Sequence, residues 1–117
     1  AYGTPGGDIQ PQAMVQLFIN VTEFGMDPQQ AIEKPRFASY SFPDSFWPHP
    51  YEPALARLEG RISKEVAADL ERRGHRIEWW PDWVETAGAL CAIIIDRDRG
   101  TLIGGADIRQ ESYAIGR

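Results

Sequence analysis

Apolar side chains recur about one helical turn apart in the first quarter of the chain. They occupy Met14, Val15, Phe18, Ile19, Val21 and Phe24. This spacing predicts an amphipathic helix. Asp8 is a plausible start signal, Pro11 suits the first turn of the helix, and Gly25 is a stop signal.

Two further helices are marked by residues that favour helix ends. In "DPQQAIEKP", Asp27 is placed to cap a short helix whose first position is Pro28, and Pro35 ends it. In "SKEVAADLERRG", Ser63 is placed to cap a second helix and Gly74 to close it. We therefore expect three helices in all.

Alternating or continuous apolar runs predict four or five strands. They lie at Arg36–Phe42, at 55–62, at 75–81 and in a hairpin formed by 89–96 and 101–107. The segment Pro43–Pro53 holds four prolines and several aromatic residues, and it is typical of an irregular loop. Early helices followed by a predicted antiparallel pair indicate an α+β fold with helices packed on a mainly antiparallel sheet.

Composition narrows the class of protein and its partners. The chain has 117 residues, 43% of them hydrophobic and 25% charged, which suits one globular domain over residues 1–117. The net charge is −5 with no Lys/Arg cluster, so we expect no nucleic-acid partner. No apolar run is long enough to predict a membrane span. Cys91, the single cysteine, lies in the apolar run "ALCAIIID" and is expected in the core rather than as a nucleophile.

The stretch "AYGTPGGDIQPQ" contains the strongest candidate for chemistry. Two glycines before a helix allow the N–H groups of Gly6 and Gly7 to turn toward one point, where they can bind an oxyanion. A plain tight turn fits the same spacing and is the commoner case. A phosphate-binding loop is weakly supported, because neither G-K-[ST] nor G-x-G-x-x-G is present.

The remaining polar and aromatic residues favour structural roles. His49 and His75 lie outside any known catalytic motif, and no Cys/His set has metal-ligand spacing, so we expect neither a metal nor a cofactor. Arg36, Asp107 and Arg109 fit structural ion pairs better than an anion site. The aromatic residues of "SFWPHPY", with Trp79, Trp80 and Trp83, are expected in the core or at a subunit contact, a binding surface being the alternative.

The order of these motifs resembles one family. "GTPGGD" precedes an apolar helix that ends in "FGMD"; "AIEKPRF", a helix ending in "RRGH" and a hairpin ending in "GGADIR" follow. In this order and spacing the chain resembles the C-terminal part of the small subunit of γ-glutamyltranspeptidases (γ-glutamyltransferases), from Gly3 to Arg117.

The resemblance implies a fold, a reaction and a partial site. Such proteins are N-terminal-nucleophile hydrolases with a four-layer αββα sandwich, in which a threonine freed by self-cleavage accepts an acyl group from a γ-glutamyl amide such as glutathione. Gly6 and Gly7 would match the oxyanion hole. The nucleophile and the residues that hold the glutamyl group would precede this segment; Thr4, inside the loop, is not that nucleophile. The abrupt start at Ala1 fits a piece of a longer chain.

Two departures leave the substrate open. Ile108 stands where the family often has proline, and "GGDIQPQ" is more similar to an amidohydrolase branch that includes oxamate-hydrolysing relatives. A non-catalytic binding module that reuses the fold is the alternative. The segment alone is expected to be inactive, to need the rest of the enzyme as a partner, and to self-associate through open apolar faces. Family members are often periplasmic or extracellular, and a cytoplasmic location stays possible.

Overall fold

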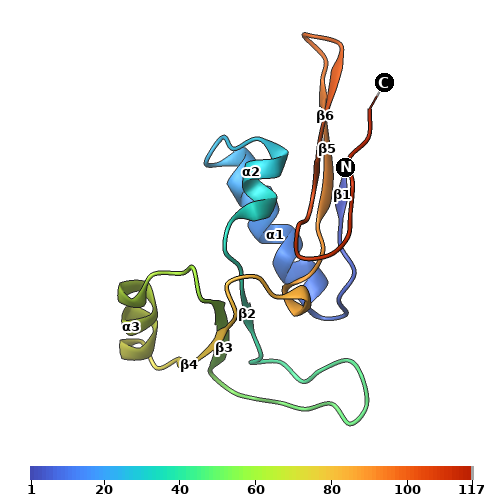
Figure 1. The fold of residues 1–117 in the computed structure, drawn as a ribbon. Helices are drawn as coiled ribbons and strands as arrows, with labels where there is room; N and C mark the ends of the chain where they lie inside the picture. The colour runs from blue at the N-terminus through green and yellow to red at the C-terminus, as the bar shows by residue number, and fades with distance from the viewer. Residues whose placement is uncertain (117) are drawn as a thin grey trace.

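The computed structural model describes residues 1–116, in which six strands form two separate three-stranded sheets (Figure 1). The first sheet has the order β1-β5-β6 and is antiparallel throughout. Its strands are β1 (Tyr2–Gly3), β5 (Cys91–Asp96) and β6 (Thr101–Ala106). The predicted hairpin is therefore confirmed, and β1 adds a short third strand that the sequence pattern did not predict.

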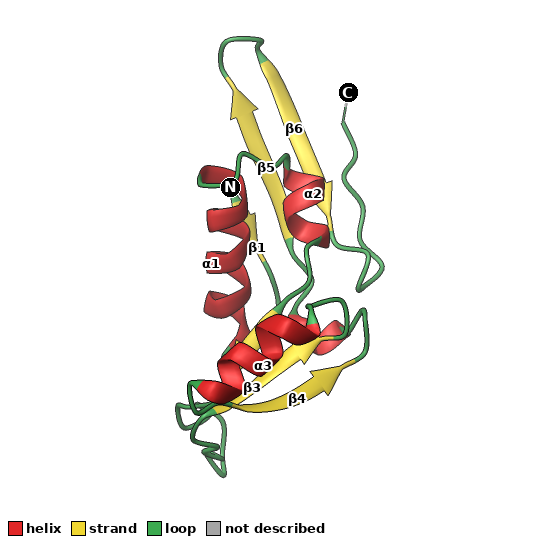
Figure 2. Cartoon of the chain, turned by 90° about the vertical axis from the view of Figure 1, so that its left-hand side faces the viewer, coloured by secondary structure: helices red, strands yellow, loops and turns green. Residues whose placement is uncertain are grey.

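The second sheet has the order β2-β3-β4 and mixes two pairing directions. Its strands are β2 (Phe37–Ser39), β3 (Leu55–Glu59) and β4 (Arg76–Trp80). β2 pairs antiparallel with β3, whereas β3 pairs parallel with β4. Parallel neighbours need a crossover, and α3 (Lys64–Arg72) provides it, lying beside β3 and β4 in Figure 2.

Helices α1 (Ile9–Thr22) and α2 (Pro28–Glu33) cover one face of the first sheet. Buried apolar side chains from both helices and from the entry into β5 form the core: Ala13, Leu17, Ala31, Ile32, Leu90 and Ala92. At Gly105 any Cβ would lie 2.9 Å from the backbone nitrogen of Gln29, so this glycine lets α2 approach β6 closely. The α+β class predicted from the pattern is confirmed.

The predicted helix caps are confirmed at two of the three helices. The Asp27 carboxylate accepts a hydrogen bond from the Gln30 N–H, and the Gln30 side chain accepts one from the Asp27 N–H, so the two form a capping box. The Ser63 hydroxyl accepts from the Val66 N–H at the start of α3. Asp8 does precede α1, but its side chain makes no capping bond and is used elsewhere.

Three glutamine side chains pair with backbone groups on the edge strands β2 and β6, where a further strand would otherwise bind. Gln12 of α1 accepts from the Ser39 N–H at 2.8 Å and donates to the Ser39 carbonyl at 3.0 Å. Gln16, one turn later, makes the same pair of bonds with Phe37. Gln29 of α2 makes the same pair with Ala106, both at 3.0 Å. These amides fix the helices against both sheets and satisfy strand groups that would otherwise lack partners.

Among residues 1–116 no helix covers the opposite face of the first sheet, although residues 113–116 lie against part of it, and the expectation for Cys91 is wrong. Cys91 is exposed, not in the core. Its neighbour Ala92 points to the covered helix face, so strand alternation places Cys91 on the other face. That face also carries Ile93, Ile95 and Leu102, whose exposed fractions are 47%, 64% and 70%.

Helix and strand positions agree with the sequence pattern, although the strands are shorter. The strand predicted at Arg36–Phe42 is reduced to β2, and the run from 55 to 62 ends at Glu59. A single turn of 3-10 helix at Glu85–Ala87 was not predicted. Among residues 1–116, no helix combines the length and the apolar character required to cross a membrane.

Candidate functional site

Gly6 and Gly7 form the turn that begins α1. Both have positive φ, at 129° and 56°, in a region that side chains rarely adopt. Their carbonyls accept the first helical hydrogen bonds, from Ile9 at 3.1 Å and from Gln10 at 3.0 Å. Within residues 1–116 neither glycine N–H donates to another group. Two backbone donors are thus held at the positive end of a helix.

Residues from the entry to β5 support this turn from behind. The Thr4 hydroxyl accepts from the Ala89 N–H at 2.8 Å and donates to the Pro5 carbonyl at 2.8 Å. Gly88 has φ 92°, and a Cβ there would lie 2.7 Å from the Thr4 hydroxyl oxygen. Thr4 therefore joins the glycine turn to the first sheet, which gives it a structural role.

A cavity of about 910 Å³ lies beside the glycine turn. Gly6, Gly7 and the start of α1 line one side of it. The segment between β2 and β3, residues 40–54, lines the other side with Phe42, Ser45 and Phe46, and we call this segment the aromatic loop. The irregular loop predicted at Pro43–Pro53 is confirmed, and its place opposite the glycines is a finding of the structure.

Asp8 ties the aromatic loop to the start of α1. Its two carboxylate oxygens accept from the Ser45 N–H at 2.7 Å and from the Ser45 hydroxyl at 2.6 Å. These bonds favour the ionised carboxylate and lower the pKa of Asp8. No local pattern predicts this contact, because Asp8 and Ser45 are 37 residues apart.

Behind the glycine turn, Arg36 lies in a buried ionic cluster with Asp107, Glu59 and Arg109. Its guanidinium donates to the Asp107 carboxylate at 2.5 Å and to the carbonyls of Ala87 and Gly88 at 3.1 and 2.9 Å. Burial and the nearby Arg109 charge lower the pKa of Arg36, although Asp107 and Glu59 oppose that shift.

Arg109 and Glu59 complete the cluster. Arg109 donates to both Glu59 oxygens at 2.6 Å and to Asp107 at 3.1 Å, with side chains of all three fully buried. Burial acts to lower the pKa of Arg109, but its hydrogen bonds and ion pairs with Glu59 and Asp107 outweigh burial and raise it. The structural interpretation of Arg36, Asp107 and Arg109 is supported by these contacts.

The ionic cluster joins segments that are distant in sequence. Glu59 ends β3, Asp107 follows β6, and the Asp107 carboxylate also accepts from the Leu90 N–H at 2.8 Å. Arg61 also donates to Glu59, at 3.0 Å, so three arginines pair with the two carboxylates. Among residues 1–116 every buried side-chain nitrogen or oxygen has a hydrogen-bond partner. The cluster therefore holds the two sheets and the support of the glycine turn in one arrangement.

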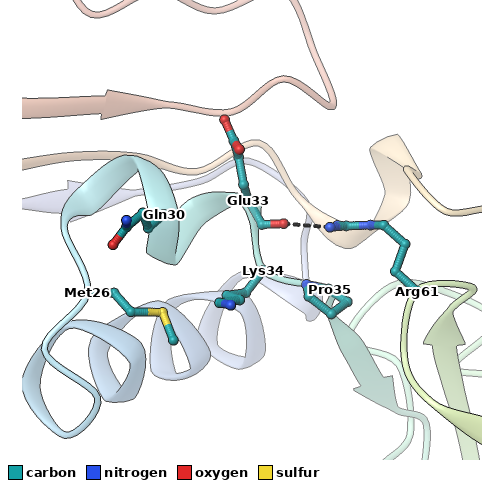
Figure 3. A pocket seen from close by; sticks show the side chains of 6 residues that line it. All are labelled: Met26, Gln30, Glu33, Lys34, Pro35 and Arg61. Carbon is teal, nitrogen blue, oxygen red and sulfur yellow. Dashed lines mark hydrogen bonds between the residues drawn. The ribbon is translucent and has the colours of Figure 1, made fainter.

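A second hollow, of about 480 Å³, lies between α2 and Arg61 (Figure 3). Met26, Gln30, Glu33, Lys34 and Pro35 line it together with Arg61, which donates to the Glu33 carbonyl at 2.8 Å. The Arg61 guanidinium also lies 3.4 Å from the centre of the Trp83 ring and is bonded to Glu59. Arg61 is thus committed to protein partners.

The other sequence candidates lie apart from the glycine turn. His49 stays within the aromatic loop, with Nδ1 2.8 Å from the Asp44 carbonyl, and His75 is exposed after α3. Within residues 1–116, no group of three or more His, Cys, Asp or Glu is arranged to hold a metal ion. A core position is wrong for Trp47, which is 86% exposed, and for Trp79 and Trp83, at 38% and 40%; a subunit contact stays a prediction.

Comparison with known proteins identifies the class. The chain belongs to the γ-glutamyltranspeptidase family, whose family model matches residues 1–117. The chain is 36% identical over 98% of its length to the glutathione hydrolase-like YwrD proenzyme of Bacillus subtilis. It is 32% identical, again over 98% of its length, to the oxamate amidohydrolase proenzyme of Klebsiella pneumoniae. The chain spans about one fifth of the length of each, 21% and 20%.

Solved structures agree with the fold. The structure of LmbA2991HD covers the whole chain at 39% identity with a TM-score of 0.90, and 21% of that chain is matched. A γ-glutamyltranspeptidase from Pseudomonas nitroreducens matches 99% of this chain and 54% of its own at a TM-score of 0.76, with 20% identity. The mixed helix and strand fold of the chain is therefore the fold of these solved structures, a γ-glutamyltranspeptidase among them.

Proposed function

We propose that this chain supplies the oxyanion-binding donors of an amide acyl transfer, carried out with a nucleophile on further polypeptide. The observation that carries the proposal is the placement of Gly6 and Gly7. Their N–H groups are not used within residues 1–116, they lie at the N-terminal end of α1, and both glycines line the cavity of about 910 Å³. Donors held in advance of reaction stabilise the charge that develops on the carbonyl oxygen.

The relatives suggest the substrate class. One is named a glutathione hydrolase-like proenzyme and another an oxamate amidohydrolase proenzyme. We propose an amide substrate, either a γ-glutamyl amide such as glutathione or a small amide such as oxamate. In the first step the nucleophile oxygen bonds to the carbonyl carbon, and the amine leaves with a proton. Water or an acceptor amine then displaces the acyl group from the nucleophile.

The nucleophile and the rest of the sandwich are proposed to come from chain that precedes this segment in the relatives. Exposed apolar side chains on the open face of the first sheet support a covering partner there. An oxyanion hole without a nucleophile forms no acyl-enzyme, so we propose that residues 1–117 alone are inactive. In the absence of the remaining chain, the same face is proposed to drive self-association.

The test is a Gly7→Ala substitution in the longest gene product that contains residues 1–117. Gly7 has φ 56°, a conformation that strains any side chain, and an added Cβ would lie 2.9 Å from the Phe46 ring, so the turn or the ring must shift. Loss of one oxyanion donor lowers kcat by about 10²–10³-fold. Release of p-nitroaniline from γ-glutamyl-p-nitroanilide and of ammonia from oxamate measures the two activities.

Gly25→Ala is the matched control for backbone strain. Gly25 has a similar φ of 64° and has open space around its Cα. It should show the strain cost of about 1–2 kcal/mol without a loss of kcat. Equal losses of kcat in both variants would contradict the oxyanion role, and activity in the purified 117-residue chain would contradict the need for an external nucleophile.

A further inference from the structure

The aromatic loop covers the candidate oxyanion site from the opposite side of the cavity. The Phe46 ring lies so close to Gly7 that an added Cβ there would be 2.9 Å from its Cε2 atom. Even so, Phe46 is 65% exposed and Phe42 is 80% exposed. A group bound next to the glycine donors would therefore meet aromatic surface first.

Hydrogen bonds hold the loop in this place. The Asp44 N–H donates to the Pro50 carbonyl at 2.9 Å, and the Asp44 carboxylate accepts from the Phe46 N–H at 2.8 Å. The two bonds from Ser45 to Asp8 then fix the loop to the residue that follows Gly7. The aromatic loop therefore has a defined position relative to the glycine donors.

The charged residues that line the cavity are already paired. Asp8 is bonded to Ser45, and Asp44 to Phe46. Arg57 donates to Glu78 at 2.8 Å and lies 3.6 Å from Glu52. A charged substrate group would have to compete with these partners, whereas the faces of the phenylalanine rings are free to pack.

We propose that Phe46, together with Phe42, selects amides that carry an apolar, preferably aromatic, group next to the scissile carbonyl. The inference rests on the proposed function, since it needs a carbonyl oxygen at Gly6 and Gly7. Phe46 is a specificity-determining residue that packs against this group, and the Asp8–Ser45 bonds hold the loop that carries it. The apolar group belongs either to the amine or to the acyl part of the substrate, and the assay separates these cases.

The test compares Phe46→Ala with the parent in the longest gene product that contains residues 1–117. One arm keeps the γ-glutamyl group and compares its anilide with its methylamide. The other arm keeps ammonia as the product and compares phenylacetamide with oxamate. Loss of the ring should lower kcat/KM for the aromatic member of one pair by about tenfold or more, and leave the small member within about twofold.

Two further variants separate specificity from general damage. Trp47→Ala removes the neighbouring aromatic side chain, which is 86% exposed and does not line the cavity, and should leave both ratios unchanged. Phe46→Tyr keeps the ring and should restore the preference. Because Phe46 is largely exposed, its loss leaves the buried core intact.

A drop confined to the anilide assigns the apolar group to the amine part, and a drop confined to phenylacetamide assigns it to the acyl part. Equal losses for all four amides, or the same loss in Trp47→Ala, would overturn the inference while leaving the proposed function standing. A parent protein that hydrolyses none of the four overturns the proposed function and, with it, this inference.

Discussion

Two regions of this molecule use carboxylates in opposite settings. In the ionic cluster, Glu59 and Asp107 are fully buried and are held by Arg36 and Arg109. At the cavity, Asp8 is exposed and is held only by Ser45. All three carboxylates have hydrogen-bond partners, but water can replace the partner of the exposed Asp8 and cannot replace the partners of the buried Glu59 and Asp107.

The two settings differ in how well they should tolerate substitution. Removal of one partner from a buried pair leaves a charge without water or a counter-ion, so the cluster tolerates little change. An exposed pair contributes little to stability, so a change at Asp8 or Ser45 should alter the free energy of unfolding little. A mutation in the ionic cluster should therefore lower the free energy of unfolding much more than a mutation that frees the aromatic loop.

The largest effect is expected from Arg109→Met. The substitution keeps much of the side-chain volume but leaves Glu59 and Asp107 buried with less positive charge. We expect a loss of about 3–5 kcal/mol in the free energy of unfolding, measured by urea denaturation. Arg72→Met, whose side chain is 73% exposed, removes an exposed pair with Asp69 and should show no measurable change. Similar losses of unfolding free energy in the two variants would contradict the expected difference between buried and exposed ion pairs.

A smaller loss is expected from Gln29→Ala, which lies between the two extremes in burial. The substitution leaves the Ala106 N–H and carbonyl, both partly buried, without the amide that now pairs with them. The expected cost is about 1–3 kcal/mol. Faster hydrogen exchange at the Ala106 amide, with unchanged exchange in α3, would show that the loss of stability is local to β6. An equal acceleration of exchange at all amides would contradict this prediction.

The smallest effect, and one that depends on pH, is expected at Asp8. Its pKa is lower in the folded protein, so its contribution is complete above the ordinary Asp range of about 3.9 and is lost as the pH falls through the lower folded value. The Ser45 amide resonance should move in that acid range while the fold persists. In Asp8→Asn the movement should be absent, and an unchanged titration there would assign it to another group.

Local elements were predictable because their signals are contained within a few residues. Asp27 with Gln30 caps α2, and Ser63 caps α3, as neighbours in sequence. The β5–β6 hairpin is marked by its apolar runs and polar turn. The glycine turn before α1 was likewise visible, although only the ordered set of motifs gave it a chemical interpretation.

The remaining features depend on contacts that no local pattern contains. Arg36 was expected to meet a carboxylate, but its pairing with Asp107 spans 71 positions. Cys91 was placed wrongly because "ALCAIIID" is apolar on both strand faces, and only the helices decide which face is covered. The position of Phe46 over Gly7 likewise depends on the path of the aromatic loop. The prolines and aromatic residues of the loop predict an irregular segment but not its path.

The ionic cluster also joins segments that leave the ribosome at different times. Arg36 and Glu59 are synthesised well before Asp107 and Arg109, and Tyr2 of β1 pairs with Ala92 of β5, which lies 90 positions later. Contacts of such separation close slowly. During synthesis Arg36 and Glu59 must therefore stay hydrated until Asp107 and Arg109 emerge, and only then can the ionic cluster hold the two sheets together.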